Sequence, residues 1–403
     1  MSAPNSKLDI DVQIGPSPDQ WMAALDSIES VHGERMVLQM GPQHPATHGV
    51  LRVELETDGE LIVRATPHIG YLHRCFEKVC ENSTWPQIVP YTDRLDYLAS
   101  MNCNLGYVAG VEKLFKIEVS ERIQTIRVLV CELNRIASHL VAIGTYGLDI
   151  GAWTPFLLLF QAREHILDLF DELCGGRLLY NYIWIGGLSH DLPDGWLKKA
   201  REFIPYFKPK IPELNDLLSY NKIFVERLAN VGVIPADLAL RYGVTGPNLR
   251  GAGVKWDIRK EEPYSGYESY EFDIPVGKGE VGTRGDCFDR YIVRVHEMEQ
   301  SVRIIEQALE RLEGMEKEDV HAAIPKTFAK VPGGEIYFRT EAPKGELGFY
   351  IVSDWKQKPS RVKCRAPSFC SLSVLPEVAP GLLIADMVAL IGSLDIVLGE
   401  VDR

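Results

Sequence analysis

The chain has 403 residues, of which 46% are hydrophobic and 25% are charged, so it is a globular protein long enough to bury a large core. Its net charge of −13 argues against a general nucleic-acid-binding role, because such proteins present a basic face. No run of about 18 apolar residues occurs, and the longest apolar candidate, residues 154–160, is too short to span a bilayer.

Residues 1–35 form a predicted N-terminal extension that lacks the basic start and apolar core of a signal peptide. The extension is acidic rather than arginine-rich, which also argues against a mitochondrial transit peptide. The eight cysteines form no Cys-x-x-Cys pair, so we expect reduced thiols that lie mostly in the core. These features favour the cytoplasm of a prokaryote, or the cytoplasmic face of its membrane through partners.

The next segment has the pattern of two strands joined by a turn rich in proline and glycine. Residues 36–40 and 50–55 are strand-like, and residues 41–49 between them read Gly-Pro-Gln-His-Pro-Ala-Thr-His-Gly. Because proline fixes its own φ and extends the residue before it, we expect His44 and His48 on a stiff turn. Imidazole exchanges protons near neutral pH, so this turn is a candidate site; the alternative is a hairpin with surface histidines.

Further along the chain, apolar residues repeat every three or four positions, as on the buried face of a helix. We expect these helices to pack as an antiparallel bundle, and a glycine pair, Gly175-Gly176, to end the third of them. The predicted helices cover approximately residues 98–115, 126–143, 155–174, 195–207 and 289–313.

Between two bundle helices, residues 243–288 are rich in glycine and tyrosine and predict loops and a small sheet. The C-terminal part of the chain then returns to a strand-like pattern. Its predicted strands cover residues 333–339, 347–352 and 361–365, and helices follow near 371–375 and 384–391.

The predicted fold class is α+β, with a central antiparallel helix bundle and β-sheet regions from the N- and C-terminal parts of the chain. After the extension we expect an N-terminal β region with the histidine turn, a helix bundle with the glycine-rich insertion, and a C-terminal α/β region. Their boundaries are residues 36–90, 91–320 with the insertion at 243–288, and 321–403.

The sequence lacks the motifs of phosphate loops, dinucleotide binding, nucleophile elbows and zinc proteases, so nucleotide binding and zinc proteolysis have no support. Four groups of polar side chains remain as candidates: the histidine turn, residues 68–78, residues 91–97 and Asp149. We expect residues 91–97 at the start of the first bundle helix and Asp149 in a loop between two bundle helices. The alternatives are a surface ion pair between Arg94 and Asp96, and a simple turn role for Asp149.

The sequence around these candidates resembles the 49-kDa (D-type) subunit family of respiratory complex I, the NADH–quinone oxidoreductase. The resemblance covers nearly the whole chain from about Met36. It is carried by the turn motif at 41–49, Pro-His-Ile-Gly-Tyr-Leu-His-Arg at 67–74, Tyr-Thr-Asp-Arg-Leu-Asp-Tyr at 91–97 and Gly-Glu-Val-Asp-Arg at 399–403. The family shares the fold of the nickel–iron hydrogenase large subunit, which agrees with the predicted layout.

The resemblance implies roles for four residues. His48 and Tyr97 would bind the quinone headgroup, and Asp149 would orient His48 and couple to it by charge. A tyrosine hydroxyl and an imidazole can hydrogen-bond the two ring oxygens and supply the two protons that quinone reduction takes up. Arg74 matches a family arginine beside the iron–sulfur cluster of a neighbouring subunit, where a cation would raise the reduction potential of the cluster.

The chain itself has no iron–sulfur motif, and we expect it to bind no metal. The resemblance therefore implies that a 4Fe-4S cluster belongs to an adjacent small subunit of the B type. The other implied partners are a 30-kDa subunit of the C type and a membrane subunit of the H type at the quinone channel. With these partners the chain would be a peripheral part of a proton-pumping enzyme and would not be active alone.

The sequence departs from the family at one position. Many members have a histidine directly after Gly-Gly-Val, whereas here Gly186-Gly187-Leu188 is followed by Ser189 and then by His190. This departure puts in doubt a proton-coupled role of that histidine near the cluster.

Two alternatives from other classes of protein remain. A hydrogenase-type large subunit would need two Cys-x-x-Cys pairs for a nickel–iron centre, but Cys75 and Cys80 are too widely spaced and residues 395–403 hold no cysteine. In a non-catalytic scaffold none of the candidates would act, and only mutation of His48 or Tyr97 separates that alternative from a quinone site.

Overall fold

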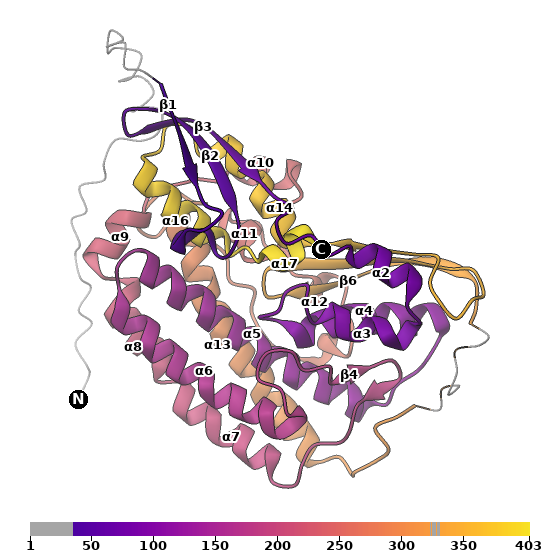
Figure 1. Ribbon diagram of the computed structural model, residues 1–403. Helices are drawn as coiled ribbons and strands as arrows, with labels where there is room; N and C mark the ends of the chain where they lie inside the picture. The colour runs from indigo at the N-terminus through magenta and orange to yellow at the C-terminus, as the bar shows by residue number, and fades with distance from the viewer. Residues whose placement is uncertain (1–34, 323, 325–327, 329–330) are drawn as a thin grey trace, which may run out of the picture.

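The computed structural model describes residues 35–322, 324, 328 and 331–403, and the predicted extension lies outside this part of the chain except for Arg35. Figure 1 shows long helices in the lower part of the view, a three-stranded sheet at the top, and the orange and yellow strands of a second sheet on the right. This arrangement of helices and sheets confirms the predicted α+β class.

The N-terminal part of the chain forms an antiparallel sheet in the order β1-β2-β3. Its strands are β1 Met36–Met40, β2 Arg52–Asp58 and β3 Leu61–His68. Alternate residues of a strand point to opposite faces, and Val53 and Leu55 of β2 are fully buried on the inner face. They share a core with helix α16, Ile384–Leu394, which Figure 1 shows in yellow beside the indigo strands. Segments from both ends of the chain therefore surround the histidine turn.

Long helices form the centre of the protein, as predicted. They are α4 Ser100–Phe115, α5 Glu121–Asp149, α6 Trp153–Cys174, α7 Trp196–Phe207 and α13 Cys287–Glu313. Helix α5 lies in the middle, because it packs against both α6 and α13 and is buried along most of its length. The side chain of Ser120 caps its N-terminus, and Gly175, at φ 71°, ends α6 where the glycine pair predicts.

Two short helices before the bundle were not predicted: α2 Phe76–Asn82 and α3 Trp85–Thr92. Helix α3 starts with a hydrogen bond from the amide of Thr84 to the side chain of Gln87 at 3.0 Å. Helices of this length are too short to show a long apolar repeat. Consequently, the prediction that residues 91–97 start the first bundle helix is wrong, since they span the end of α3 and the turn before α4.

The prediction of a small sheet at residues 243–288 is also wrong. This segment contains no strand, and its elements are α11 Gly246–Gly251, α12 Ile258–Glu261 and the 3₁₀ turn η3 Tyr267–Ser269. Some backbone amides of this segment bond to a side chain rather than to a neighbouring strand. The carboxylate of Asp289 accepts hydrogen bonds from the amides of Lys278, Gly279 and Gly285.

The predicted C-terminal strands are confirmed. Strands β6 Gly334–Ala342, β7 Gly345–Ser353 and β8 Arg361–Arg365 form an antiparallel sheet in this order, and β6 and β7 pack against α4. The helix predicted near 371–375 is a pair, α14 Pro367–Ser373 and α15 Leu375–Val378, and an unpredicted helix, α17 Leu398–Asp402, ends the chain. The remaining elements are β4 Ile183–Trp184, β5 Gly187–Leu188, α8 Lys210–Leu214, η2 Asn215–Ser219, α9 Lys222–Leu228 and α10 Ala236–Arg241.

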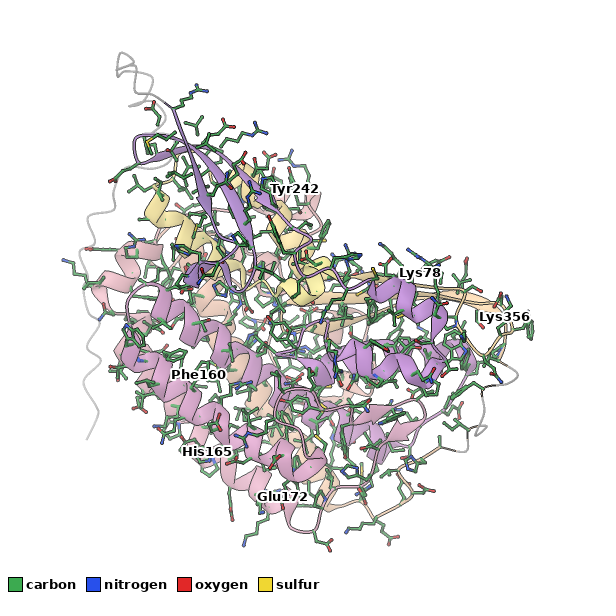
Figure 2. The ribbon with its side chains drawn as sticks, viewed as in Figure 1. Lys78, Phe160, His165, Glu172, Tyr242 and Lys356 are labelled. Carbon is green, nitrogen blue, oxygen red and sulfur yellow. The ribbon has the colours of Figure 1, made fainter. Side chains whose placement is uncertain are left out.

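Charged side chains cover the outside of these elements, and Figure 2 shows the labelled Lys78 and Lys356 pointing outward at one end of the molecule. Over the described ranges, no helix combines the length and the apolar character needed to cross a membrane. All eight cysteines carry free thiols, as predicted, and five of them are buried.

Candidate functional site

The turn at residues 41–49 holds its two histidines in different ways. His44 caps the 3₁₀ turn η1, Pro45–Thr47, because its Nδ1 accepts a hydrogen bond from the amide of Ala46 at 3.2 Å. His48 follows η1 with a left-handed backbone, φ 50° and ψ 39°. The prediction that both histidines lie on a turn between two strands is confirmed, and His44 has a local structural role that leaves His48 as the chemical candidate.

The side chain of His48 meets the carboxylate of Asp149. The distance from Nε2 of His48 to Oδ2 of Asp149 is 3.2 Å, and the two side chains are 15% and 10% exposed. The atoms are at ion-pair distance without satisfying the angles of a hydrogen bond. The prediction that Asp149 lies in a loop is wrong, because α5 continues through Gly144 and Gly147 and ends at Asp149.

The position of Asp149 at a helix end gives a physical reason for this contact. The C-terminal end of a helix carries a partial negative charge from its free carbonyl groups. A carboxylate there gains from a cation beside it, yet the last turn of α5 contains no basic residue. The imidazole of His48 is the group that meets this carboxylate.

Tyr97 lies in the turn between α3 and α4, and its side chain is partly buried. Burial raises the pKa of its hydroxyl, and the carboxylate of Asp96 raises it further, while Lys344 and Arg74 act in the opposite direction. The hydroxyl of Tyr97 therefore keeps its proton at neutral pH and can donate it.

Arg74 ties the Tyr97 segment to the C-terminal end of the chain. Its Nη2 donates hydrogen bonds to the backbone carbonyls of Arg94 and Gly399, the latter at 3.3 Å. Its own amide donates to the carbonyl of Arg403 at 3.0 Å. The Arg74 residue as a whole is exposed.

Helix α17 connects these segments. Leu398 lies against the histidine turn, and Gly399 packs on the backbone carbonyl of Leu95. The carboxylate of Asp402 accepts hydrogen bonds from two amides just before Arg74, at 2.8 and 2.7 Å. In the sequence this helix is visible only as a motif of the resemblance, because its position depends on contacts with residues far away in the chain. The structure thus joins His48 to Asp149, and it joins Arg74 to the Tyr97 segment both directly and through α17.

Replacing Gly399 by alanine is expected to displace α17. A Cβ atom at this position would lie 2.5 Å from the carbonyl oxygen of Leu95 and 3.0 Å from that of Arg94, and backbone atoms cannot move aside cheaply. Overpacking of this kind costs about 1–3 kcal/mol, so the thermal unfolding temperature of the assembled complex should fall. Gly314→Ala is the matched control, because a Cβ there meets its nearest atom at 3.5 Å. Equal unfolding temperatures for the two variants would contradict the role of α17.

The candidates at 68–78 form ion pairs near the surface. Glu77 lies 2.7 Å from Arg361 and 3.0 Å from Lys363, and Lys78 pairs with Glu81 on the exposed side of α2. Residues of this segment and of the C-terminal end line a cavity of about 440 Å³. Exposed ion pairs contribute little to stability, so this cavity rather than the pairs is the notable feature.

The surface pair considered for Arg94 and Asp96 does not form. Arg94 lines an open cavity of about 640 Å³ together with Tyr91 and Trp184. Asp96 instead points inward and is fully buried, with its carboxylate 3.1 Å from the ammonium of Lys344.

His190 is held by local contacts. Its Nδ1 is 2.8 Å from the hydroxyl of Ser189, and its Nε2 contacts the carbonyl of Leu173 near the end of α6. Across the residues whose positions the structure gives, no three His, Cys, Asp or Glu side chains are grouped so that they could hold a metal ion.

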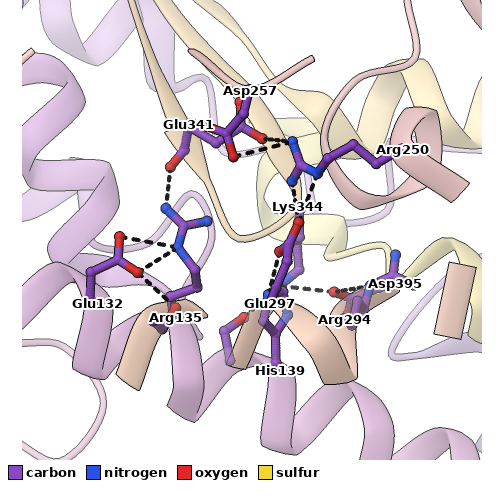
Figure 3. Close-up of polar contacts among 12 residues, drawn as sticks. Glu132, Arg135, His139, Arg250, Asp257, Arg294, Glu297, Glu341, Lys344 and Asp395 are labelled. Carbon is purple, nitrogen blue, oxygen red and sulfur yellow. Dashed lines mark hydrogen bonds and ion pairs between the residues drawn. The ribbon is translucent and has the colours of Figure 1, made fainter. Parts of the chain in front are cut away.

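A network of buried charged side chains lies where α5, α11, α13 and β6 meet (Figure 3). Arg250 is at its centre: its Nε lies 2.8 Å from Oε1 of Glu297, and its Nη1 lies 2.7 Å from Oε1 of Glu341. Glu297 also contacts Nε2 of His139 at 2.9 Å. Although burial alone would raise it, the pKa of Glu297 is held below its usual range by Arg250 and then by His139.

Sequence reasoning missed this network. Charged residues on an amphipathic helix normally face solvent, and the apolar stripe of α5 gives no reason to bury the opposite face. The available signal is the pair of opposite charges three positions apart, Glu132 and Arg135, but such pairs are equally typical of a solvated helix.

Comparison with known proteins identifies the family. The profile of the family described as "Respiratory-chain NADH dehydrogenase, 49 Kd subunit" matches residues 149–403. The chain is 56% identical over 371 residues to the NADH-quinone oxidoreductase D subunit of Pelodictyon phaeoclathratiforme, with 92% of each chain covered. The chain belongs to the family of NADH-quinone oxidoreductase D subunits.

Other relatives agree with this assignment. The D subunit of Chlorobium luteolum is 55% identical over 92% of this chain and 94% of its own. A D subunit of Cytophaga hutchinsonii is 54% identical over 91% of this chain and 95% of its own. The resemblance inferred from the motifs is therefore confirmed at the level of the family, and the chain is a subunit of an oxidoreductase complex.

Proposed function

We propose that this chain forms the quinone-headgroup pocket of an NADH-quinone oxidoreductase and supports electron transfer from the terminal 4Fe-4S cluster of an adjacent subunit to quinone. The contact between His48 and Asp149 carries this proposal most directly, because it joins a titratable side chain on a stiff turn to a partner carboxylate from a distant helix. The names of the relatives supply the substrate class.

The proposed chemistry uses two proton donors. Reduction of a quinone to a quinol takes up two electrons and two protons. The hydroxyl of Tyr97 can give a proton to one ring oxygen, and the imidazole of His48 can serve the other. Asp149 fixes the orientation of His48, as carboxylates do for many functional histidines.

The electron source lies outside this chain in the proposal. When present in the neighbouring small subunit of the B type, the cluster supplies electrons to the quinone. We place Arg74 beside it, because this guanidinium is exposed and its orientation is fixed by backbone carbonyls. A cation in this position raises the reduction potential of a cluster.

Further partners and location complete the proposal. A 30-kDa subunit of the C type and a membrane subunit of the H type at the quinone channel would hold the chain at the cytoplasmic face of a prokaryotic membrane. We also propose that the fold is that of the hydrogenase large subunit. A nickel–iron centre itself gains no support, because Cys75 is exposed whereas Cys80 is buried, and burial raises the pKa of the Cys80 thiol to about 12.

Replacing Asp149 by asparagine tests the proposal. The amide has nearly the shape of the carboxylate but no charge, so we expect quinone reduction to fall about tenfold, as on loss of a partner that orients a histidine. Reduction of an artificial acceptor such as ferricyanide should stay unchanged, because electrons leave the complex before the quinone site. The matched control is Asp171→Asn, on the exposed face of α6. Wild-type quinone reduction in an assembled Asp149→Asn complex would refute the proposed pair.

A further inference from the structure

Two buried carboxylates contact the ammonium group of Lys344, and one of them belongs to Asp96, the residue before Tyr97. The Nζ of Lys344 lies 3.1 Å from Oδ2 of Asp96 and 3.8 Å from Oδ2 of Asp395, and all three side chains are almost fully buried. Glu400 of α17 is a third buried acid, close enough for its charge to raise the pKa of Lys344, and its Oε1 accepts a hydrogen bond from the amide of Ser368 at 3.0 Å. Figure 3 shows Lys344 and Asp395 beside the charged network of the bundle.

This cluster is short of both hydrogen bonds and positive charge. Oδ2 of Asp96, Oδ2 of Asp395 and Oε2 of Glu400 are buried without a hydrogen-bond partner. An ionised oxygen is costly in such surroundings, whereas protonation removes the charge. The cations that face the three acids are Lys344 and Arg294, whose Nε is 3.5 Å from Asp395. Together, the three carboxyl groups and the two cations have no net charge when one carboxyl group holds a proton.

The proton belongs to the pair formed by Asp96 and Glu400. Burial, followed by the charge of Asp96, raises the pKa of Glu400 to about 8, and Lys344 opposes this shift. Burial also raises the pKa of Asp96. The other titratable neighbours of Glu400 are the thiols of Cys103, Cys364 and Cys370, which burial keeps protonated. Because the charge of Asp96 acts on Glu400, the two acids titrate as a pair.

We propose that the Asp96–Glu400 pair holds the proton that reprotonates Tyr97 after Tyr97 has protonated the reduced quinone. The inference rests on the proposed function, because it requires Tyr97 to act as a proton donor. Asp96 precedes Tyr97 in the chain and lies close enough for its charge to raise the pKa of the Tyr97 hydroxyl, and Glu400 follows Gly399, which packs on the carbonyl of Leu95.

The proposed step moves protons only. The O–H bond of Tyr97 breaks as a quinone oxygen gains the proton, and the electrons come from NADH through the complex. The O–H bond of the pair then breaks, and the tyrosinate oxygen regains its proton. The pair keeps one more negative charge beside Lys344 until it takes up a proton from solvent.

The test compares quinone reduction as a function of pH in membranes that carry the whole complex. Glu400→Gln removes the stored proton, and Glu346→Gln is the control, because Glu346 is a buried acid outside the cluster that pairs with Arg339. The stored proton is present below pH 8 and lost above it, so the wild-type rate should fall as pH rises through about 8. In Glu400→Gln we expect this fall to be missing and the rate at neutral pH to be about tenfold lower. Glu346→Gln should keep the wild-type profile.

Infrared difference spectra of quinone reduction give a second measurement. We expect a carboxylic-acid C=O signal in the wild type that is lost in Glu400→Gln. An unchanged pH profile in Glu400→Gln would overturn the inference and leave the role of Tyr97 intact. The absence of any carboxylic-acid signal in the wild type would also overturn the inference. That measurement does not depend on the assembly of a variant. If Tyr97→Phe reduces quinone at the wild-type rate, the proposed function fails first and the inference falls with it.

Discussion

Replacing Arg250 by methionine is expected to lower the amount of assembled complex about tenfold or more. Arg250 is fully buried, and it is the cation that faces both Glu297 and Glu341. Removing one partner of a buried ion pair costs about 3–5 kcal/mol, because the other charge is left without compensation. This is a large share of the roughly 5–15 kcal/mol that stabilises a folded domain. Native gels of membranes from cells that express the variant measure the effect.

A matched control separates burial from the mere loss of an arginine. Arg241→Met removes an arginine from α10, where its partner Asp237 is 3.6 Å away and both side chains are mostly exposed. Exposed pairs contribute about 0–1 kcal/mol, so this variant should assemble at the wild-type level. Equal assembly of Arg250→Met and Arg241→Met would show that the buried network does not stabilise the fold.

The long helices and the outer strands could be predicted from the sequence because their signals are local. The end of α6 is an example: Gly175 adopts the left-handed backbone that glycine favours, and the helix stops there. Strands β2 and β8 alternate buried apolar and more exposed residues, which reveals their period. Such features depend on neighbours in the sequence, and the structure reproduces them closely.

The loop predicted at Asp149 shows where local reasoning fails. Gly144 and Gly147 weaken the helical pattern, and glycine in a helix interior is normally unfavourable. In the structure they are packing positions, because a Cβ at Gly147 would lie 3.1 Å from Leu218 and one at Gly144 3.5 Å from Phe160. Their small size lets neighbouring elements approach, so α5 continues to Asp149. This tertiary requirement is not visible in the sequence of α5 alone.

The charged core and helix α17 are unpredictable for the same reason. Arg250 and Glu341 lie far apart in the chain, and only the complete fold brings them together in the buried core. The position of Gly399 against the Tyr97 segment likewise depends on the end of the chain returning to its beginning. For the candidate site, the residue types and the turn could be predicted, whereas the supporting contacts could not.

Tyr97→Phe tests the central claim, that this chain supplies the quinone headgroup site, most directly. The substitution removes one hydroxyl and little volume, so the partly buried ring should still pack. Loss of a proton donor lowers a rate about 100-fold or more. The measurement is quinone reduction by membranes, with assembly checked on native gels and ferricyanide reduction as the control. We expect quinone reduction to fall about 100-fold while ferricyanide is reduced normally. Unchanged quinone reduction in a fully assembled complex would contradict the account and favour a scaffold role for this chain.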